Sequence, residues 1–359
     1  MKNNSQIYST TKKAIKTNQN ELIKLINLKY LQTHKFKTKL RLCENCKIIQ
    51  EGGIRTKGYF KAGGLIKPEQ IDCNRSDIVN CSPDVINNEF DEISENPLFT
   101  IITVVYNGEK FLEEAILSVI KQNYDNIEYI IVDGGSTDKT LDIIKKYDQF
   151  IDYWISGKDQ GIYDAMNRGI KLAIGEYIGF VNADDFIYPD TISNIAKKAK
   201  EFHFDYTLGP IHICNSEGYV KETALVLKNF MMNNLYLSHM PAHHLSFYIR
   251  NDYLKTIGLF DLNFKIRSDY EMMIRAIENS KLHYTFDCIM GAFREGGISG
   301  SYETFFEGYK IMAKYNVSIL IRLKTTFRSL LIVFITKNAP QILVKWLRRL
   351  FSSGHYQLK

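Results

Sequence analysis

Short apolar runs alternate with segments of helical spacing between residues 97 and 301. The run 100–106 is continuously apolar or β-branched, which is typical of a strand buried on both faces. Similar runs predict three more strands, at 129–132, 152–155 and 177–181. Helical spacing predicts helices at 113–120, 141–147 and 162–173, and Ser136 or Thr137 is expected to cap the second of them. Alternation of this kind predicts β-α-β units on a mainly parallel central sheet flanked by helices, which is an α/β fold.

The rest of the chain lacks this alternation, so the sequence as a whole divides into three predicted zones. We expect residues 1–96 to form an N-terminal extension, residues 97–301 an α/β domain, and residues 302–359 a helical basic tail. The first residues are polar and Lys-rich, without the apolar segment of a signal peptide. The longest apolar run of the tail, 330–335, is far shorter than the ~20 residues of a spanning helix. We therefore expect a cytoplasmic protein, or one bound peripherally to the inner face of the cell membrane.

The distribution of charge sets the C-terminus apart. The net charge is +6, yet residues 316–359 contain no Asp or Glu. Their basic residues are Arg322, Lys324, Arg328, Lys337, Lys345, Arg348, Arg349 and Lys359. Apolar residues recur among them at helical spacing, and basic amphipathic helices are typical of contact with anionic lipid. Packing of these helices on the α/β domain is the alternative. A basic tail on a nearly neutral remainder does not describe a nucleic-acid-binding domain.

Four cysteines in the N-terminal extension form a candidate metal site. They are Cys43, Cys46, Cys73 and Cys81. Cys43 and Cys46 form a CxxC motif, and its two thiolates together with those of Cys73 and Cys81 suit a tetrahedral structural zinc site. Free or buried thiols are the alternative, because the second pair is widely spaced.

Polar residues follow each predicted strand of the α/β domain, at 106–107, 133–138, 159–161 and 184–185. The carboxyl ends of parallel strands meet at one edge of the sheet, where ligands bind, so these clusters predict a polar ligand site. Turn and cap residues are the alternative for any single cluster. Asp184 and Asp185 are adjacent carboxylates that repel each other unless a cation lies beside them. Mn²⁺ or Mg²⁺ would use them together with diphosphate oxygens, whereas a solvated turn is the plainer interpretation.

The sequence resembles a known family through several segments in order. The first are TVVYNGEKFLEEAILSVIKQNYDNIEYIIVDGGSTDKTLDII and GIYDAMNRGIKLAIGEYIGFVNADD, and MPAHHLSFYIR, FKIRSDYEMMIRAI and FREGGIS follow. Together they resemble the family 2 glycosyltransferases with the GT-A fold, and bacterial O-antigen and capsule polysaccharide enzymes in particular. The resemblance extends over roughly residues 97–300.

The resemblance implies a reaction and a set of site residues. It implies inverting transfer of a sugar from a nucleotide-diphosphate donor, UDP-linked in our expectation, to a hydroxyl of a glycan or lipid-linked acceptor. Asp269 matches the general base and Asp185, with Asp184, the metal and diphosphate motif. The remaining donor-binding candidates are Tyr106, Asn107, Asp133, Asp164, His244 and Arg294. Plainer roles remain for three residues: a helix N-cap for Asp269, a structural histidine for His244 and a surface ion pair for Arg294.

Two other functions compete with a glycosyltransferase. A non-catalytic sugar-nucleotide or glycan-binding module could use the same fold, and loss of Asp185 or Asp269 would have favoured it. A nucleotidyltransferase would show a Gly-rich triphosphate loop with a basic residue near the first strand, and residues 106–109 lack one.

Overall fold

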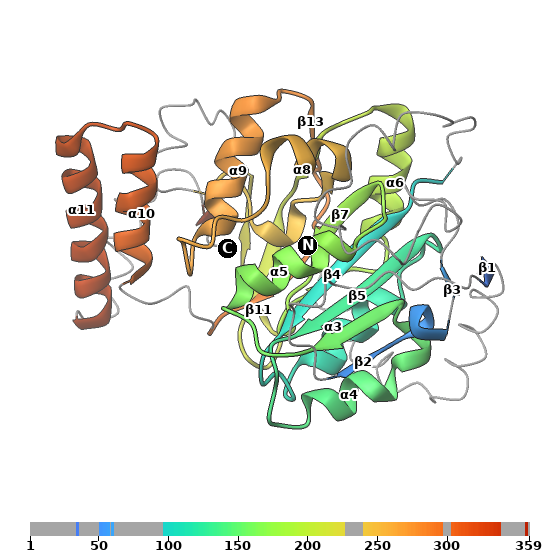
Figure 1. Cartoon of the computed structure of the whole chain (residues 1–359). Helices are drawn as coiled ribbons and strands as arrows, with labels where there is room; N and C mark the ends of the chain where they lie inside the picture. Colours follow the sequence, from blue (N-terminus) through green and yellow to red (C-terminus); the bar gives the residue numbers. More distant parts are fainter. Residues whose placement is uncertain are drawn as a thin grey trace, which may run out of the picture. The chain divides into compact units, whose positions relative to one another are not determined.

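The computed structural model describes residues 34–35, 50–57, 59–60, 96–226, 240–296, 303–338 and 356–357 (Figure 1). The four cysteines of the zinc prediction and tail residues 339–355 lie outside the described residues. The chain divides into two compact units. Unit 1 comprises Met1–Asp159, Arg168–Tyr177 and Val181–Glu201, and unit 2 comprises Gln160–Asn167, Ile178–Phe180 and Phe202–Lys359.

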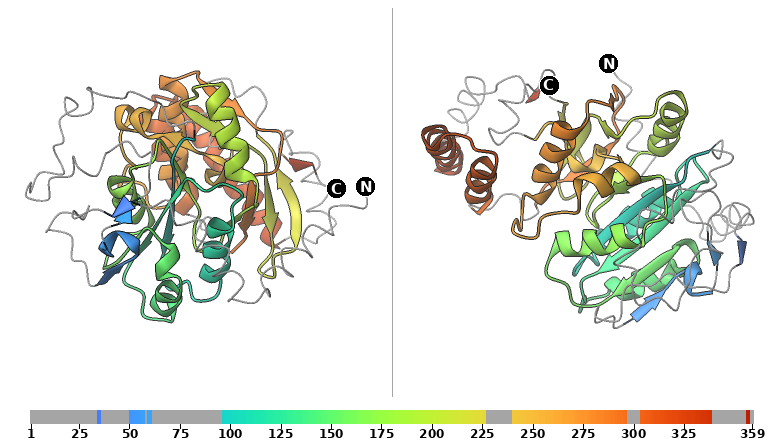
Figure 2. Two further views of the ribbon diagram at one scale, coloured as in Figure 1. Left: turned by 90° about the vertical axis from the view of Figure 1, so that its right-hand side faces the viewer. Right: turned by 45° about the horizontal axis from the view of Figure 1, so that its top comes forward.

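Unit 1 is built on the predicted parallel strands. β4 (Phe99–Val105) and β5 (Ile127–Asp133) are buried along their whole length and pair in parallel, with Val105 opposite Asp133. β6 (Tyr153–Ser156) continues the parallel sheet beside β5. The teal strands β4 and β5 lie side by side in Figures 1 and 2. β2 (Gln50–Gly52) adds an antiparallel strand on the outer side of β6. Because β4 and β5 end in register, the loops that follow them begin side by side.

Helices of the predicted type connect these strands. α3 (Leu112–Ile120) buries Ala115, Ile116 and Val119, and α4 (Thr140–Lys146) follows β5. α5 (Ile162–Leu172) and β7 (Tyr177–Phe180) contribute residues to both units. The remaining elements of unit 1 include η2 (Ile54–Lys57), η6 (Asp148–Phe150), β8 (Phe186–Ile187) and α6 (Thr191–Glu201). A short pair, β1 (His34–Lys35) and β3 (Tyr59–Phe60), is antiparallel. The α/β prediction is therefore confirmed.

A buried ion pair joins the N-terminal segment to the sheet of unit 1. Arg55 in η2 and Glu128 in β5 pair with each other, and each is only 1% exposed. Arg55 also donates to the Leu172 carbonyl oxygen at 2.8 Å. Glu128 accepts hydrogen bonds from Thr100 Oγ1 (2.5 Å) and the Ile174 backbone N–H (2.9 Å). These partners compensate the cost of burying both charges.

Unit 2 carries two groups of strands. β9 (Tyr206–Leu208) pairs antiparallel with β12 (Ile249–Arg250) and parallel with β13 (His283–Thr285). β10 (Ile211–Cys214) lies between β14 (Gly291–Arg294) and β11 (Val220–Ala224), and β11 also pairs with β15 (Tyr356–Gln357).

The helices of unit 2 are α8 (Asn251–Ile257), α9 (Ser268–Asn279), α10 (Glu303–Lys314) and α11 (Ile319–Asn338), with the 3₁₀ turn η7 (His244–Ser246) before β12. α9 buries Tyr270, Met272, Met273 and Ile274. In the described part of the chain, no helix combines the length and hydrophobicity needed to cross a membrane.

Candidate active site

The loop after β5 is organised around Asp133, whose side chain is fully buried. Its carboxylate accepts hydrogen bonds from Ser136 Oγ at 2.5 Å and from Ser156 Oγ at 2.6 Å. The backbone N–H groups of Gly135 and Ser136 donate to the same carboxylate at 3.1–3.2 Å. Gly135 has φ +86°, a conformation that L side chains rarely adopt. Asp133 therefore fixes the shape of this loop from within.

The predicted helix cap is wrong. α4 begins at Thr140, and its N-cap residue, Lys139, makes no side-chain cap hydrogen bond. Ser136 instead binds Asp133, and its hydroxyl oxygen accepts a hydrogen bond from the Asn107 backbone N–H at 2.7 Å. The side chain that was expected to start a helix thus connects the loops after β4 and β5.

The loop after β4 presents an aromatic surface beside this connection. Tyr106 directly follows β4 and is 66% exposed, so its side chain is accessible to a ligand. Asn107 adopts the left-handed conformation (φ 51°), and its Oδ1 accepts a hydrogen bond from the Thr137 backbone N–H at 2.9 Å. Asn is among the few residues that tolerate this conformation. Its side chain holds the loop, and Tyr106 remains free to stack.

Asp184 and Asp185 follow β7 in a turn closed by a hydrogen bond from the Asp185 N–H to the Asn182 carbonyl at 3.0 Å. Asp185 is only 1% exposed, which does not fit a simple solvated turn, and Asp184 is partly exposed. Among the described residues, no cluster of three or more His, Cys, Asp or Glu side chains could hold a metal ion by itself. Two adjacent carboxylates are nevertheless what Mg²⁺ or Mn²⁺ uses when phosphate oxygens and water complete its coordination. The donor set therefore fits a metal held jointly by protein and ligand.

Asp269 lies in the first turn of α9 in unit 2, one residue inside the helix rather than at its N-cap, which is Arg267. The Tyr163 hydroxyl is 2.9 Å from Asp269 Oδ1, and His244 Nδ1 is 3.8 Å from Oδ2. Asp269 is 18% exposed, so it is confined but still reachable. Two groups that can carry or share a proton, Tyr163 and His244, thus meet at the Asp269 carboxylate.

Burial controls the protonation of the groups around Asp269. The pKa of Tyr163 is raised well above its ordinary value, first by burial and then by the Asp269 charge. Tyr163 therefore stays protonated and can donate at any physiological pH. The pKa of His243, next to His244, is lowered well below its usual value by burial and then by His244. Its Nδ1 accepts a hydrogen bond from the Leu245 backbone N–H, which requires a neutral ring.

The two other predicted contacts also lie in unit 2. Asp164 is in the first turn of α5 and accepts a hydrogen bond from the Gln160 backbone N–H at 3.0 Å. Arg294 ends β14 and is only 3% exposed, so the surface ion pair considered from the sequence is wrong. Sequence reasoning missed Tyr163, although it lies inside the quoted GIYDAMNRG segment. Nothing local distinguishes it from a core tyrosine, because its partner is distant in sequence.

Comparison with known proteins shows which family part of this chain resembles. Residues 100–258 match the model of Glycosyl transferase family 2. An uncharacterized glycosyltransferase of Haemophilus influenzae is 38% identical over 125 residues, covering 34% of this chain and 50% of that protein. A PGL/p-HBAD biosynthesis glycosyltransferase of Mycobacterium bovis is 39% identical over 104 residues, covering 28% of this chain and 41% of that protein. The chain therefore spans half or less of the length of these curated relatives.

A solved structure supports the fold. The crystal structure of S. aureus TarS 1-349 in complex with UDP-GlcNAc is similar with a TM-score of 0.50 at 24% identity. The likeness covers 67% of this chain and 73% of that chain. The family match contains the Asp133 loop and Asp185 but ends before α9. Over residues 100–258 the chain is therefore similar to the glycosyltransferase family 2 domain, and its fold is of the kind seen in TarS.

Proposed function

We propose that the protein is an inverting glycosyltransferase, which transfers a sugar from a UDP-linked donor to a hydroxyl of a glycan or lipid-linked acceptor. The observation that carries the proposal is the carboxylate of Asp269, which lies 2.9 Å from the Tyr163 hydroxyl and 3.8 Å from His244, in a chain whose residues 100–258 match the family 2 model. We infer a role in cell-surface polysaccharide synthesis of the O-antigen or capsule type.

The stacking contact with the nucleotide base and the metal ligands are assigned to unit 1. The exposed ring of Tyr106 is suited to stacking against the nucleotide base. Asn107 and Asp133 act by holding the two adjoining loops, through Thr137 and Ser136. Asp184 and Asp185 would hold Mn²⁺ or Mg²⁺, which when bound supplies positive charge against a departing diphosphate.

The acceptor base is assigned to unit 2. A sugar hydroxyl is a poor nucleophile until a positioned base removes its proton, and Asp269 is the carboxylate suited to do so. The single proton of the Tyr163 hydroxyl is shared between Asp269 Oδ1 at 2.9 Å and the Ile266 carbonyl at 2.6 Å, which ties the carboxylate to the loop before α9. His244 lies 3.8 Å from the other carboxylate oxygen. Attack opposite the leaving group inverts the anomeric carbon. We assign Asp164, His244 and Arg294 to donor contacts as a further part of the proposal.

Binding and turnover test the proposal separately. Calorimetric titration with UDP and with GDP, each with and without Mn²⁺, is expected to show metal-dependent binding of UDP. Asp185→Asn should abolish that metal dependence, while Asp142→Asn, a change to an exposed carboxylate of the same unit, should not. Failure of UDP to bind in the presence of Mn²⁺ would remove the donor assignment.

Asp269→Asn tests the reaction. It is expected to leave UDP binding unchanged and to lower UDP release from the preferred UDP-sugar by about 10²–10⁴-fold, the usual contribution of a general base. Unchanged turnover in Asp269→Asn would refute the base assignment. If UDP binds but the wild type turns over no UDP-sugar with any hydroxyl acceptor, the non-catalytic binding module becomes the better interpretation.

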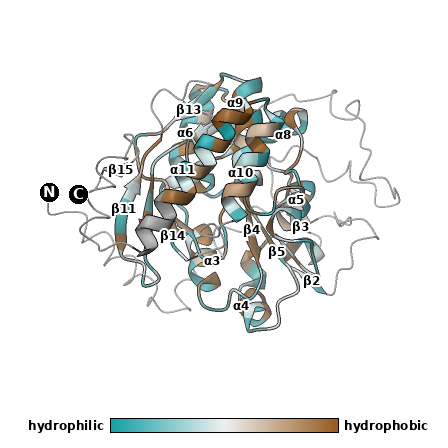
Figure 3. Cartoon of the chain, turned by 90° about the vertical axis from the view of Figure 1, so that its left-hand side faces the viewer, coloured by the Kyte–Doolittle hydropathy of each residue, from teal (hydrophilic) through white to brown (hydrophobic). Residues whose placement is uncertain are grey.

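We also propose that α11 contacts an anionic membrane surface. Six of its apolar side chains are at least 45% exposed: Ile319, Leu320, Ile321, Leu323, Phe327 and Leu331. Brown, apolar ribbon is visible along the described turns of this helix in Figure 3. Leu320, Leu323 and Phe327 share one helical stripe, and Lys324 and Arg328 flank it. An apolar stripe with basic neighbours suits anionic headgroups.

Vesicle sedimentation tests the membrane proposal. Lys324→Glu with Arg328→Glu should reduce binding to phosphatidylglycerol vesicles. Lys145→Glu with Lys171→Glu, an equal charge change at exposed positions elsewhere, should not. Equal binding of both variants would argue against a role for α11.

A further inference from the structure

The loop that leads into α9 is held by a carboxylate from α10. We propose that Glu307 is a positioning residue for Asp269, acting through this loop; the inference rests on the proposed role of Asp269 as the base. α10 lies beyond the segment that matches the family model, so neither the match nor the resemblance assigns it a role.

Glu307 accepts hydrogen bonds from three consecutive backbone N–H groups. These are Lys265 N–H at 2.6 Å to Oε1, and Ile266 N–H and Arg267 N–H at 2.9 Å each to Oε2. Glu307 is only 8% exposed. Hydrogen bonds to an ionised carboxylate are roughly twice as strong as those between neutral groups, and water competes little at a buried site. Glu307 therefore fixes three successive peptide groups at once.

The same loop reaches Asp269 by two short routes. Arg267 is the N-cap residue of α9, so the peptide that Glu307 holds lies two residues before the catalytic carboxylate. The Ile266 carbonyl accepts a hydrogen bond from the Tyr163 hydroxyl at 2.6 Å, and Tyr163 also contacts Asp269. A shift of Ile266 would therefore move both the start of α9 and the tyrosine that orients Asp269.

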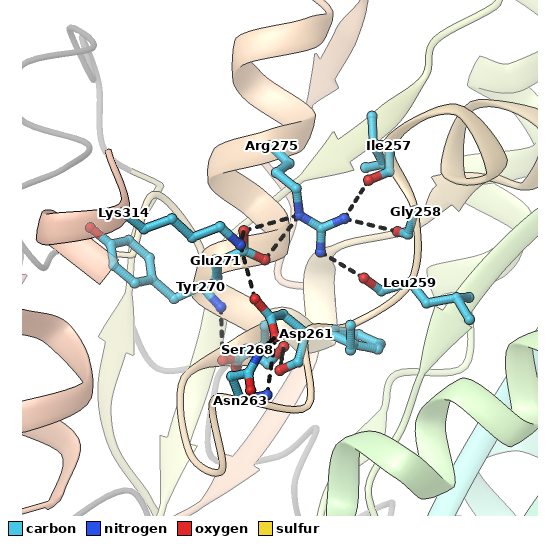
Figure 4. Close-up of polar contacts among 12 residues, drawn as sticks. Ile257, Gly258, Leu259, Asp261, Asn263, Ser268, Tyr270, Glu271, Arg275 and Lys314 are labelled. Atoms are coloured by element: carbon cyan, nitrogen blue, oxygen red, sulfur yellow. Dashed lines mark hydrogen bonds and ion pairs between the residues drawn. The ribbon is translucent and has the colours of Figure 1, made fainter. Parts of the chain in front are cut away.

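A second cluster, which includes Lys314 at the end of α10, holds the first turn of α9 through Glu271 (Figure 4). Glu271, two residues after Asp269, is fully buried and accepts hydrogen bonds from Lys314 Nζ (2.7 Å), Tyr315 Oη (2.9 Å) and Arg275 Nε (2.9 and 3.1 Å). Lys314 also pairs with Asp261 at 2.9 Å, at the start of the same loop.

Arg275 extends the second cluster to the end of α8. Its guanidinium donates to the carbonyl oxygens of Ile257, Gly258 and Leu259, as Figure 4 shows. Glu307 thus attaches the loop before α9 to α10, and Lys314 attaches Glu271 in the first turn of α9 to the end of α10. The distribution of these bonds indicates that Asp269 is positioned from outside the matched segment.

A purely structural role for Glu307 predicts a different result from a positioning role. Loss of a structural contact would lower stability, without a specific dependence on Asp269. Loss of positioning would lower kcat while UDP affinity, assigned to unit 1, stays constant. A misplacement of about 1 Å can cost on the order of 10²-fold in rate.

The experiment compares Glu307→Ala and Glu307→Gln with Glu303→Ala, an exposed glutamate on the same helix. UDP binding with Mn²⁺ is measured by calorimetry, and turnover as UDP release from the UDP-sugar that the wild type uses. Hydrogen exchange of the peptide covering residues 265–267 reports on the loop independently of activity. Each variant is also made in the Asp269→Asn background.

We expect Glu307→Ala to bind UDP within twofold of wild type, to exchange faster at residues 265–267 and to lose about 10²-fold in kcat. Glu307→Gln retains one acceptor oxygen and should recover part of that loss. In the Asp269→Asn background Glu307→Ala should cause no further loss, because both changes act on one group. Wild-type kcat in Glu307→Ala, or an equal loss in both backgrounds, would overturn the inference. Full activity of Asp269→Asn alone would instead overturn the proposed function.

Discussion

Replacement of Arg55 by Met is expected to destabilise unit 1 more than most single substitutions. Methionine preserves much of the length and apolar contact of the arginine stem but removes the guanidinium. Glu128 would then be a buried carboxylate, 1% exposed, with hydrogen bonds from Thr100 and Ile174 but without its cation. Removing one partner of a buried ion pair costs about 3–5 kcal/mol. Burial lowers the pKa of Arg55 to about 10, an effect that Asp152 opposes, so the guanidinium is charged at pH 7.

Denaturant unfolding at pH 7 measures this loss. Trp154 in β6 lies against Gly52 of β2 and donates to Asp148, so its fluorescence reports on this part of the sheet. Trp346→Phe makes it the sole tryptophan reporter. Lys145→Met removes an exposed cation from the same unit and should change the free energy of unfolding by no more than about 0.5 kcal/mol.

A double variant identifies the cause of the loss. Arg55→Met with Glu128→Gln contains no buried unpaired charge and should be at least about 2 kcal/mol more stable than Arg55→Met alone. A loss below about 1 kcal/mol in Arg55→Met would refute the reasoning, because it would mean that Glu128 is hydrated or that η2 does not dock. Equal losses in the single and double variants would attribute the effect to packing rather than charge.

Three further predictions concern the candidate site. Burial holds the pKa of His243 well below 6.5, so the unfolded chain binds a proton there before the folded protein does, and the folded state loses stability as the pH falls below 6.5. Urea unfolding at pH 5 and pH 7.5 should therefore show a smaller change in the free energy of unfolding for His243→Asn than for wild type, by up to about 1.4 kcal/mol per pH unit. Tyr163→Phe removes the hydroxyl that orients Asp269 and should lower kcat about tenfold with unchanged UDP affinity, whereas an unchanged rate would exclude an orienting role. Gly135→Ala forces a side chain into φ +86° and should weaken UDP binding measured by calorimetry, at a stability cost of about 1–2 kcal/mol; wild-type affinity would separate this loop from the donor.

The sequence predicted the parallel strands well because their cause is local. β4 and β5 lie within two residues of the predicted boundaries, since continuous β-branched runs can be buried only as interior strands. The helix cap failed because Ser136 has a stronger partner in Asp133, which follows from loop geometry rather than from the pattern. The N-cap interpretation of Asp269 was wrong by two residues for the same reason: the helix begins where Glu307 holds the preceding loop.

Long-range carboxylates were the least predictable part of the site. Glu271 and Glu307 stand in helical segments where charged residues ordinarily face water, and their partners are distant in sequence. The assignments of Asp184, Asp185, Asp164 and Arg294 as ligand contacts stay predictions. The domain boundaries at 96 and 301 also stay predictions.

The antiparallel strand β2 has a consequence for any shortened form of this protein. Gln50–Gly52 covers the outer edge of β6, which would otherwise present unpaired N–H and C=O groups to other molecules. A chain that began at residue 97 would contain the whole family-matched segment and yet expose this edge, together with the Trp154 ring that packs on Gly52. Such a chain is expected to self-associate through β6, so a shortened form that stays monomeric is expected to start upstream of residue 50.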